Sequence, residues 1–70
     1  MSHWSSTKAG KVLRALQRIG WTIVSQRGSH AKLKHPQLGS YTFAFHDKEE
    51  IGPKMLARIA KHTGLTPEDI

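Results

Sequence analysis

The spacing of apolar residues near the start of the chain predicts an amphipathic helix over residues 8–19. Candidate N-cap residues precede it at positions 5–7, and Gly20 follows it as a stop signal. Apolar residues recur there every three or four positions, which is the period of one helix face. These positions are Ala9, Val12, Leu13, Leu16 and Ile19.

A second helix is predicted from Pro53, a favoured first helical residue, to a stop at Gly64. Its expected apolar side consists of Met55, Leu56, Ile59 and Ala60. Thr66 and Pro67 then indicate a short final turn.

Between the helices the pattern changes to alternation, which predicts three strands joined by short turns. Residues 21–26 are rich in β-branched and aromatic side chains, although the adjacent Ile23 and Val24 leave the inward phase open. From His30 to His35, apolar residues and His35 fall on one face, and His30, Lys32 and Lys34 fall on the other. In the third strand Tyr41, Phe43 and Phe45 alternate with Thr42, Ala44 and His46. The expected fold is α+β in the order αβββα, a three-stranded antiparallel sheet with both helices on one face.

The length of 70 residues allows a single domain over residues 1–70, with little room for an enclosed cavity. The chain has no cysteine, no signal peptide and no long apolar run. We therefore expect a cytoplasmic protein without disulfides and without a membrane segment.

The charge is distributed unevenly along the chain. Residues 1–46 contain no Asp or Glu and carry +7, while the remainder carries −1, which gives the net charge of +6. Basic residues of the first helix fall opposite its apolar side: Lys8, Lys11, Arg14 and Arg18. Such a surface favours a polyanionic partner, and nucleic acid fits better than a membrane because no basic helix also exposes bulky apolar residues.

Several short motifs are spread over nearly the whole chain: Ile19-Gly20-Trp21, Gln26-Arg27-Gly28-Ser29-His30, Lys34-His35-Pro36, the third strand ending in His46, Ile51-Gly52-Pro53 and Thr63-Gly64-Leu65. Together they resemble the HicA-type mRNA interferase toxins of bacterial toxin–antitoxin systems. The resemblance implies a double-stranded-RNA-binding-domain-like fold and a ribonuclease that needs no metal or cofactor. It also implies a catalytic histidine at His30 and an inhibitory antitoxin of the HicB type.

The residues around His30 suit RNA cleavage, which needs a group that exchanges a proton with a 2′-OH or a leaving oxygen near neutral pH. Lys32 lies roughly 7 Å further along the strand and is placed to stabilise charge on a phosphate. Gly28 allows a phosphodiester to approach the backbone, and Ser29 offers a hydrogen-bond donor. Arg27 and Lys34 complete the expected substrate-binding set.

The other histidines and the tryptophans receive different interpretations. His35 falls on the opposite face, roughly 17 Å from His30, and is interpreted as a structural cap before Pro36. His46 approaches His30 only if the strand register allows it, which the sequence leaves open. The histidines show no metal-ligand spacing. Trp21 is expected in the core, Trp4 in a mobile terminus.

Two functions remain in view at this point. The first is a toxin that cleaves mRNA, with His30 as general acid or base. The second is a non-catalytic RNA-binding module that uses the same basic faces, since both functions require the same charge.

Overall fold

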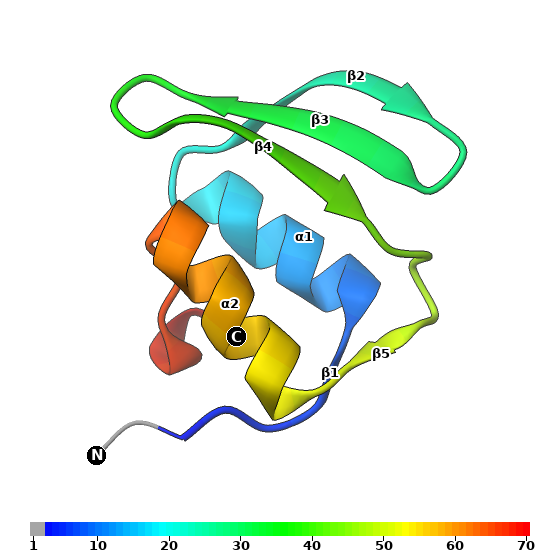
Figure 1. Ribbon diagram of the computed structural model, residues 1–70, viewed down its shortest axis with the longest axis vertical. Coiled ribbons are helices and arrows are strands. Elements are labelled where there is room, and N and C mark those ends of the chain that lie inside the picture. Colours follow the sequence, from blue (N-terminus) through cyan, green and yellow to red (C-terminus); the bar gives the residue numbers. More distant parts are fainter. Residues whose placement is uncertain (1–2) are drawn as a thin grey trace.

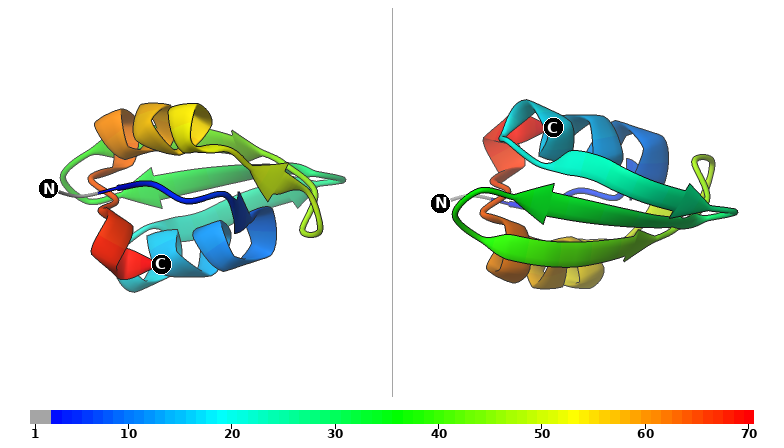
Figure 2. Two further views of the ribbon diagram at one scale, coloured as in Figure 1. Left: turned by 90° about the horizontal axis from the view of Figure 1, so that it is seen from below. Right: turned by 90° about the horizontal axis from the view of Figure 1, so that it is seen from above.

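The computed structural model describes residues 3–70 and shows two helices packed on a three-stranded antiparallel sheet (Figure 1). The elements in chain order are β1 (Thr7–Lys8), α1 (Ala9–Arg18), β2 (Thr22–Arg27), β3 (His30–His35), β4 (Gly39–Ala44), β5 (Glu50–Ile51), α2 (Pro53–Thr63) and the 3₁₀ turn η1 (Pro67–Asp69). The sheet order is β2-β3-β4, and both helices cover the same face of it (Figure 2). The predicted α+β fold is confirmed.

A second, two-stranded ribbon was not predicted. β1 pairs with β5, with Thr7 opposite Ile51 and Lys8 opposite Glu50. Two residues per strand are too few to show a hydrophobic period, so the sequence pattern contains no signal for them.

The ribbon also changes how α1 begins, and the predicted side-chain cap at positions 5–7 is wrong. Lys8 occupies the N-cap position and forms no side-chain cap. The first amides of the helix instead donate to backbone carbonyls of the loop after β4, Ala9 N to Glu49 O at 2.8 Å and Gly10 N to Asp47 O at 3.0 Å. The loop therefore supplies the acceptors that a capping side chain would otherwise provide.

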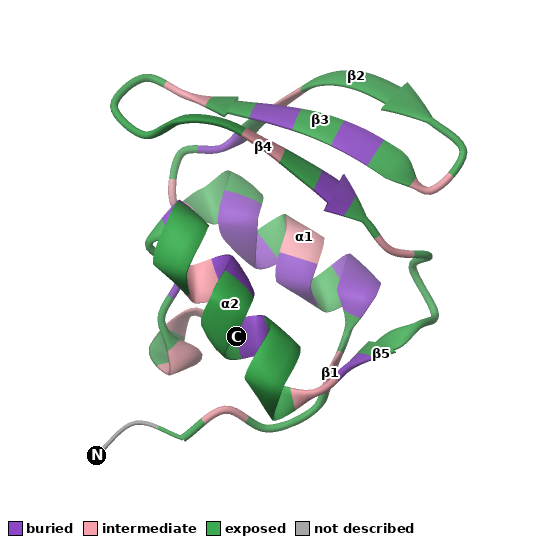
Figure 3. Cartoon of the chain, in the orientation of Figure 1, coloured by how far each residue is buried: buried purple, intermediate pink, exposed green. Residues whose placement is uncertain are grey.

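The core lies between the helices and the inner face of the sheet, where the buried residues cluster (Figure 3). It comprises Ala9, Val12, Ala15, Leu16, Trp21, Ala31, Leu33, Phe43, Ile51, Leu56, Ile59 and Leu65. Trp21 is buried as predicted, and its indole Nε1 donates to Thr63 O at 3.0 Å. This bond joins the residue that precedes β2 to the end of α2.

Two apolar residues differ from expectation. Met55 was predicted on the inner side of α2 but is 37% exposed, because Leu56, Ile59 and Thr63 are the residues that α2 buries. Trp4 was expected in a mobile terminus but is half-buried and packs against the core.

A bulge in β2 settles the phase that the sequence left open. Ile23 pairs with Leu33 and Ser25 pairs with Lys32, so the register shifts at Val24. Ile23 is half-buried against the core, whereas Val24 is exposed. The predicted third strand is also displaced, since β4 ends at Ala44 instead of His46.

Candidate functional site

The outer face of the sheet is free of helices (Figure 2). The side chains that the strand register places on it are small or polar. Opposed residues of antiparallel strands share a face, so the register arranges this outer face in three rows across β2, β3 and β4. The rows are Arg27, His30 and Ala44; Ser25, Lys32 and Thr42; and Thr22, Lys34 and Ser40. All of these residues are exposed. We call this surface the open face.

The predicted residues His30, Lys32, Lys34 and Arg27 are brought together on the open face. β3 alternates as expected, with Ala31 and Leu33 buried and the three polar residues exposed (Figure 3). Arg27 joins them because it is the cross-strand partner of His30. Hydroxyl side chains flank both lysines in their rows. The surface can therefore offer cations and hydrogen-bonding groups to a polyanion over its whole length.

His30 stands at the beginning of β3, directly after the turn at Gly28 and Ser29. Gly28 has φ +59°, a left-handed conformation that glycine adopts without strain. Among the described residues the His30 side chain has no hydrogen-bond or ring partner, and it is exposed. Its imidazole is thus available to a ligand from solvent.

A hollow of about 190 Å³ lies beside this turn. Gln26, Gly28 and Ser29 border it from the hairpin, and Phe45, His46 and Asp47 border it from the segment after β4. That segment passes beneath the tip of the β2–β3 hairpin (Figures 1 and 2). The two predicted turn residues Gly28 and Ser29 therefore share a cavity with His46, whose position the sequence left open.

His35 has a structural role, as predicted. Its Nδ1 accepts hydrogen bonds from the backbone amides of Gln37 at 3.1 Å and Leu38 at 3.3 Å. Nε2 therefore carries the proton and donates to Ile19 O at 3.2 Å. The ring also lies 5.2 Å from that of Trp21. Both nitrogens are occupied, so His35 holds the β3–β4 turn against the end of α1.

Gly20 makes this arrangement possible. A Cβ at that position would lie 2.8 Å from His35 Nε2, which is closer than real contacts allow. Only glycine lets the end of α1 approach the histidine so closely.

Comparison with protein families assigns the chain. The family described as the HicA toxin of bacterial toxin–antitoxin systems matches residues 9–65. The chain belongs to the HicA toxin family. The match includes both helices, the three-stranded sheet, His30 and His46. A toxin of such a system has an antitoxin as its partner. The comparison with curated proteins gives no match.

The basic side of α1 forms a surface of this HicA-family chain separate from the open face, because α1 lies on the other side of the sheet (Figure 1). Lys11 and Arg14 are exposed there. Arg18 is engaged within the fold, since its guanidinium donates to Asp69 O at 2.7 Å and holds η1 against the helix. The open face and the basic side of α1 are thus separate surfaces, and His30 belongs to the open face.

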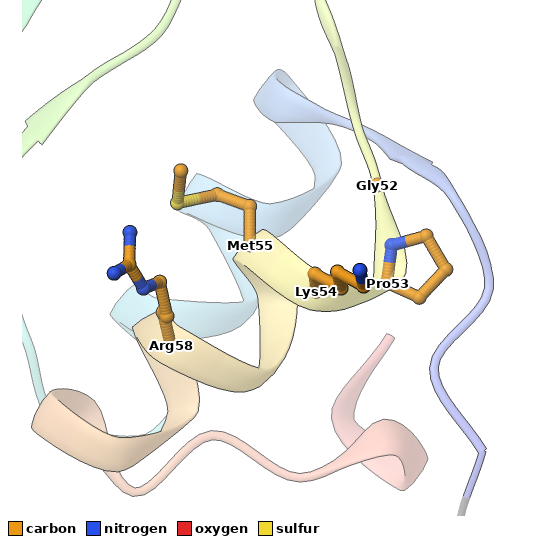
Figure 4. Close-up of a pocket in the computed structure, with 5 residues that line it drawn as sticks. All are labelled: Gly52, Pro53, Lys54, Met55 and Arg58. Carbon is orange, nitrogen blue, oxygen red and sulfur yellow. The ribbon is translucent and has the colours of Figure 1, made fainter.

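A second, wider hollow of about 840 Å³ lies at the start of α2. Gly52, Pro53, Lys54, Met55 and Arg58 line it, and Met55 and Arg58 project from the same side of the helix (Figure 4). Its lining contains neither a histidine nor a carboxylate, so it offers no group for proton transfer near neutral pH.

Within residues 3–70 no cluster of three or more His, Cys, Asp or Glu side chains is arranged to hold a metal ion. None of the helices in that part of the chain is long and apolar enough to cross a membrane.

Proposed function

We propose that this HicA-family toxin is an endoribonuclease that cleaves mRNA without a metal ion, with His30 exchanging the proton. The observation that carries the proposal is the exposed imidazole of His30, which has no partner among residues 3–70 and lies in a row with Arg27 and next to Lys32 on the open face. Family membership and the motif Gly28-Ser29-His30 support the same conclusion.

The reaction that suits these groups is attack of a ribose 2′-OH on the adjacent phosphorus. A 2′-O–P bond forms, the P–O5′ bond breaks, one proton leaves the 2′-OH and one proton is delivered to the 5′ oxygen. The products are a 2′,3′-cyclic phosphate and a free 5′-OH. Histidine performs either proton transfer near neutral pH, and the charge of Lys32 stabilises the negative phosphorane.

The open face favours a single RNA strand lying along β3. Lys32 and Lys34 follow His30 at intervals of about 7 Å, because alternate residues of a strand point to the same side. Neighbouring phosphates of an extended single strand are spaced similarly. The three rows contain no aromatic side chain, so bases are not held by stacking there, and contacts fall mainly on phosphates and sugars.

Cleavage and simple RNA binding are separated by incubating labelled RNA with the protein in EDTA. We expect the wild type to cleave and His30→Ala to lose at least about 10²-fold in rate, as is typical for removal of a general acid or base. His62→Ala is the matched control, since His62 stacks on Tyr41 with ring centroids 5.9 Å apart and belongs to α2. It should cleave normally.

Binding without cleavage by the wild type would establish the RNA-binding module instead. Normal cleavage by His30→Ala would remove His30 from the reaction. A loss of cleavage that coincided with loss of cooperative unfolding would assign His30 a structural role in place of a catalytic one. Thermal unfolding of each variant makes that distinction.

We further propose that the antitoxin partner is of the HicB type and presents an acidic surface that covers His30 on the open face. The site is flat and exposed, so a protein surface can mask it directly, and opposite charge accelerates association. Diethyl pyrocarbonate should modify His30 in the free toxin and spare it in the complex, as read by peptide mass spectrometry. Full reactivity of His30 in a tight complex would exclude direct occlusion.

A further inference from the structure

The reaction proposed above requires two proton transfers, and one imidazole can perform only one of them at a time. The second transfer needs a group on the other side of the same phosphodiester. We infer that His46 is this second catalytic residue, a general acid that protonates the 5′ oxygen while His30 accepts the proton of the 2′-OH. The inference rests on the proposed ribonuclease function.

The strand register places the two histidines near each other. Ala44 is the cross-strand partner of His30, and His46 follows Ala44 by two residues. Neighbouring strands lie about 5 Å apart and two residues span at most about 7 Å, so the two Cα atoms are separated by no more than roughly 12 Å. Two imidazoles with a phosphate between them can bridge such a distance.

The hollow beside the turn supplies the place for the leaving group. Gln26, Gly28 and Ser29 form one side of it, and Phe45, His46 and Asp47 form the other; His30 follows Ser29 directly in the chain without lining the hollow. A strand of RNA that runs along β3 and passes the hairpin tip meets His30 from the open face and His46 from the segment beneath. His46 is exposed, so its imidazole is accessible to the RNA.

The two histidines have different charged neighbours, basic ones at His30 and both signs at His46, since Lys48 lies in the same turn as Asp47 and Glu49. Arg27 is the cross-strand partner of His30, and Lys32 is on the same face. Near His46, the Glu49 carboxylate accepts a hydrogen bond from the His46 backbone amide at 3.3 Å, and Asp47 borders the same hollow. The two histidines thus have different neighbours, and we assign the acid to His46 because it borders the hollow beside the turn, where a leaving group has room.

The segment that carries His46 is also fixed in position. Glu49 N donates to His46 O at 2.9 Å, which closes the turn from His46 to Glu49. The carbonyls of Asp47 and Glu49 in turn accept the first amides of α1. The backbone at His46 is therefore anchored to a helix, as positioning of a catalytic group requires.

The experiment compares two leaving groups at the cleavage position, once that position is mapped with the wild type. One oligoribonucleotide carries the natural 5′ oxygen there, and a second carries sulfur in its place. A thiolate leaves without being protonated, so a general acid is dispensable for the sulfur substrate only. Wild type, His30→Ala, His46→Ala, His46→Gln and the control His62→Ala are assayed on both.

We expect both His46 variants to lose about 10²-fold or more on the oxygen substrate and to recover nearly the wild-type rate on the sulfur substrate. His30→Ala should remain slow on both. Wild-type rates for His46→Ala and His46→Gln on the oxygen substrate would overturn the inference, and so would equal losses on the two substrates, which indicate a structural role. A wild type that cleaves neither substrate would refute the ribonuclease proposal itself.

Discussion

At the scale of single residues, the histidines differ in how many of their ring atoms the fold already uses. His35 has both nitrogens bonded to the backbone, and His62 stacks on Tyr41, whereas the ring of His30 is unpartnered in the described part of the chain. The contacts that each imidazole makes within the fold therefore distinguish structural histidines from catalytic candidates.

Tyr41 leads to a prediction about alkaline stability. Burial raises the pKa of Tyr41 above 10.0 in the folded state. The folded state then holds a proton that the unfolded state releases, so stability is unaffected below about pH 10 and falls as the pH rises above it. Tyr41→Phe keeps the stacked ring and removes this loss.

The measurement is the urea midpoint of wild type and Tyr41→Phe at pH 8 and pH 11. The urea midpoint of Tyr41→Phe, relative to that of the wild type, should be higher at pH 11 than at pH 8. Tyr41 is the only tyrosine in the sequence, so the phenolate absorbance gives its titration directly. A difference that does not change with pH would contradict the prediction.

At the scale of elements, the sequence predicts helices and strands whose apolar residues recur at a regular period, and it misses contacts that have no such period. The alternation of β3 fixes which side chains share the face of His30, and this was predicted correctly because one inward set is apolar. The β1–β5 ribbon and the backbone capping of α1 depend on contacts between distant residues with no local pattern. The relation of His46 to His30 was open for the same reason, since it depends on the register of β4.

Gly28 in the β2–β3 hairpin has two expected roles, to form the turn and to let a phosphodiester approach the backbone, and substitutions can separate them. A Cβ there meets nothing within 4 Å, so only the positive φ restricts the residue. Asparagine tolerates a left-handed conformation better than alanine does. Gly28→Ala should cost about 1 kcal/mol, and Gly28→Asn less.

If the phosphodiester approaches the Gly28 backbone closely, Gly28→Asn should lower RNA cleavage despite its retained stability. Gly39→Asn is the matched control, because Gly39 also has a positive φ with nothing within 4 Å and lies at the other turn of the sheet. It should cleave at the wild-type rate. Undiminished cleavage by Gly28→Asn would limit Gly28 to its role in the turn.

At the scale of the whole molecule, the fold divides its positive charge between two sides. Arg27, Lys32 and Lys34 lie on the open face, and the basic residues of the helices lie on the opposite layer (Figure 2). Composition predicts a polyanionic partner but does not distinguish these surfaces, because strand alternation and helix packing separate them only in three dimensions.

Salt dependence identifies the surface that binds RNA. Roughly four phosphate contacts to a single strand give a slope near −3 in a plot of log affinity against log salt. Replacing Lys32 and Lys34 by serine should make the slope less negative by about 1.4, which is about 0.7 for each lost contact.

The control replaces the exposed helix residues Lys11 and Lys61 by serine, which removes the same net charge. Its slope should remain that of the wild type, as measured by fluorescence anisotropy over a series of salt concentrations. A larger change in this control than in the open-face variant would move the RNA site to the helices.

The loop that follows β4 has a genetic consequence. The carbonyls of Asp47 and Glu49 hold the start of α1, and Phe45, His46 and Asp47 border the hollow beside the β2–β3 turn. In a selection for cells that survive expression of the toxin, escape mutations at His30 should leave full amounts of folded protein. Mutations in residues 47–49 should instead be recovered largely as loss of protein, because a displaced loop exposes helix amides and the unfolded chain is degraded. Protein abundance among survivors therefore distinguishes residues needed for activity alone from residues needed for folding.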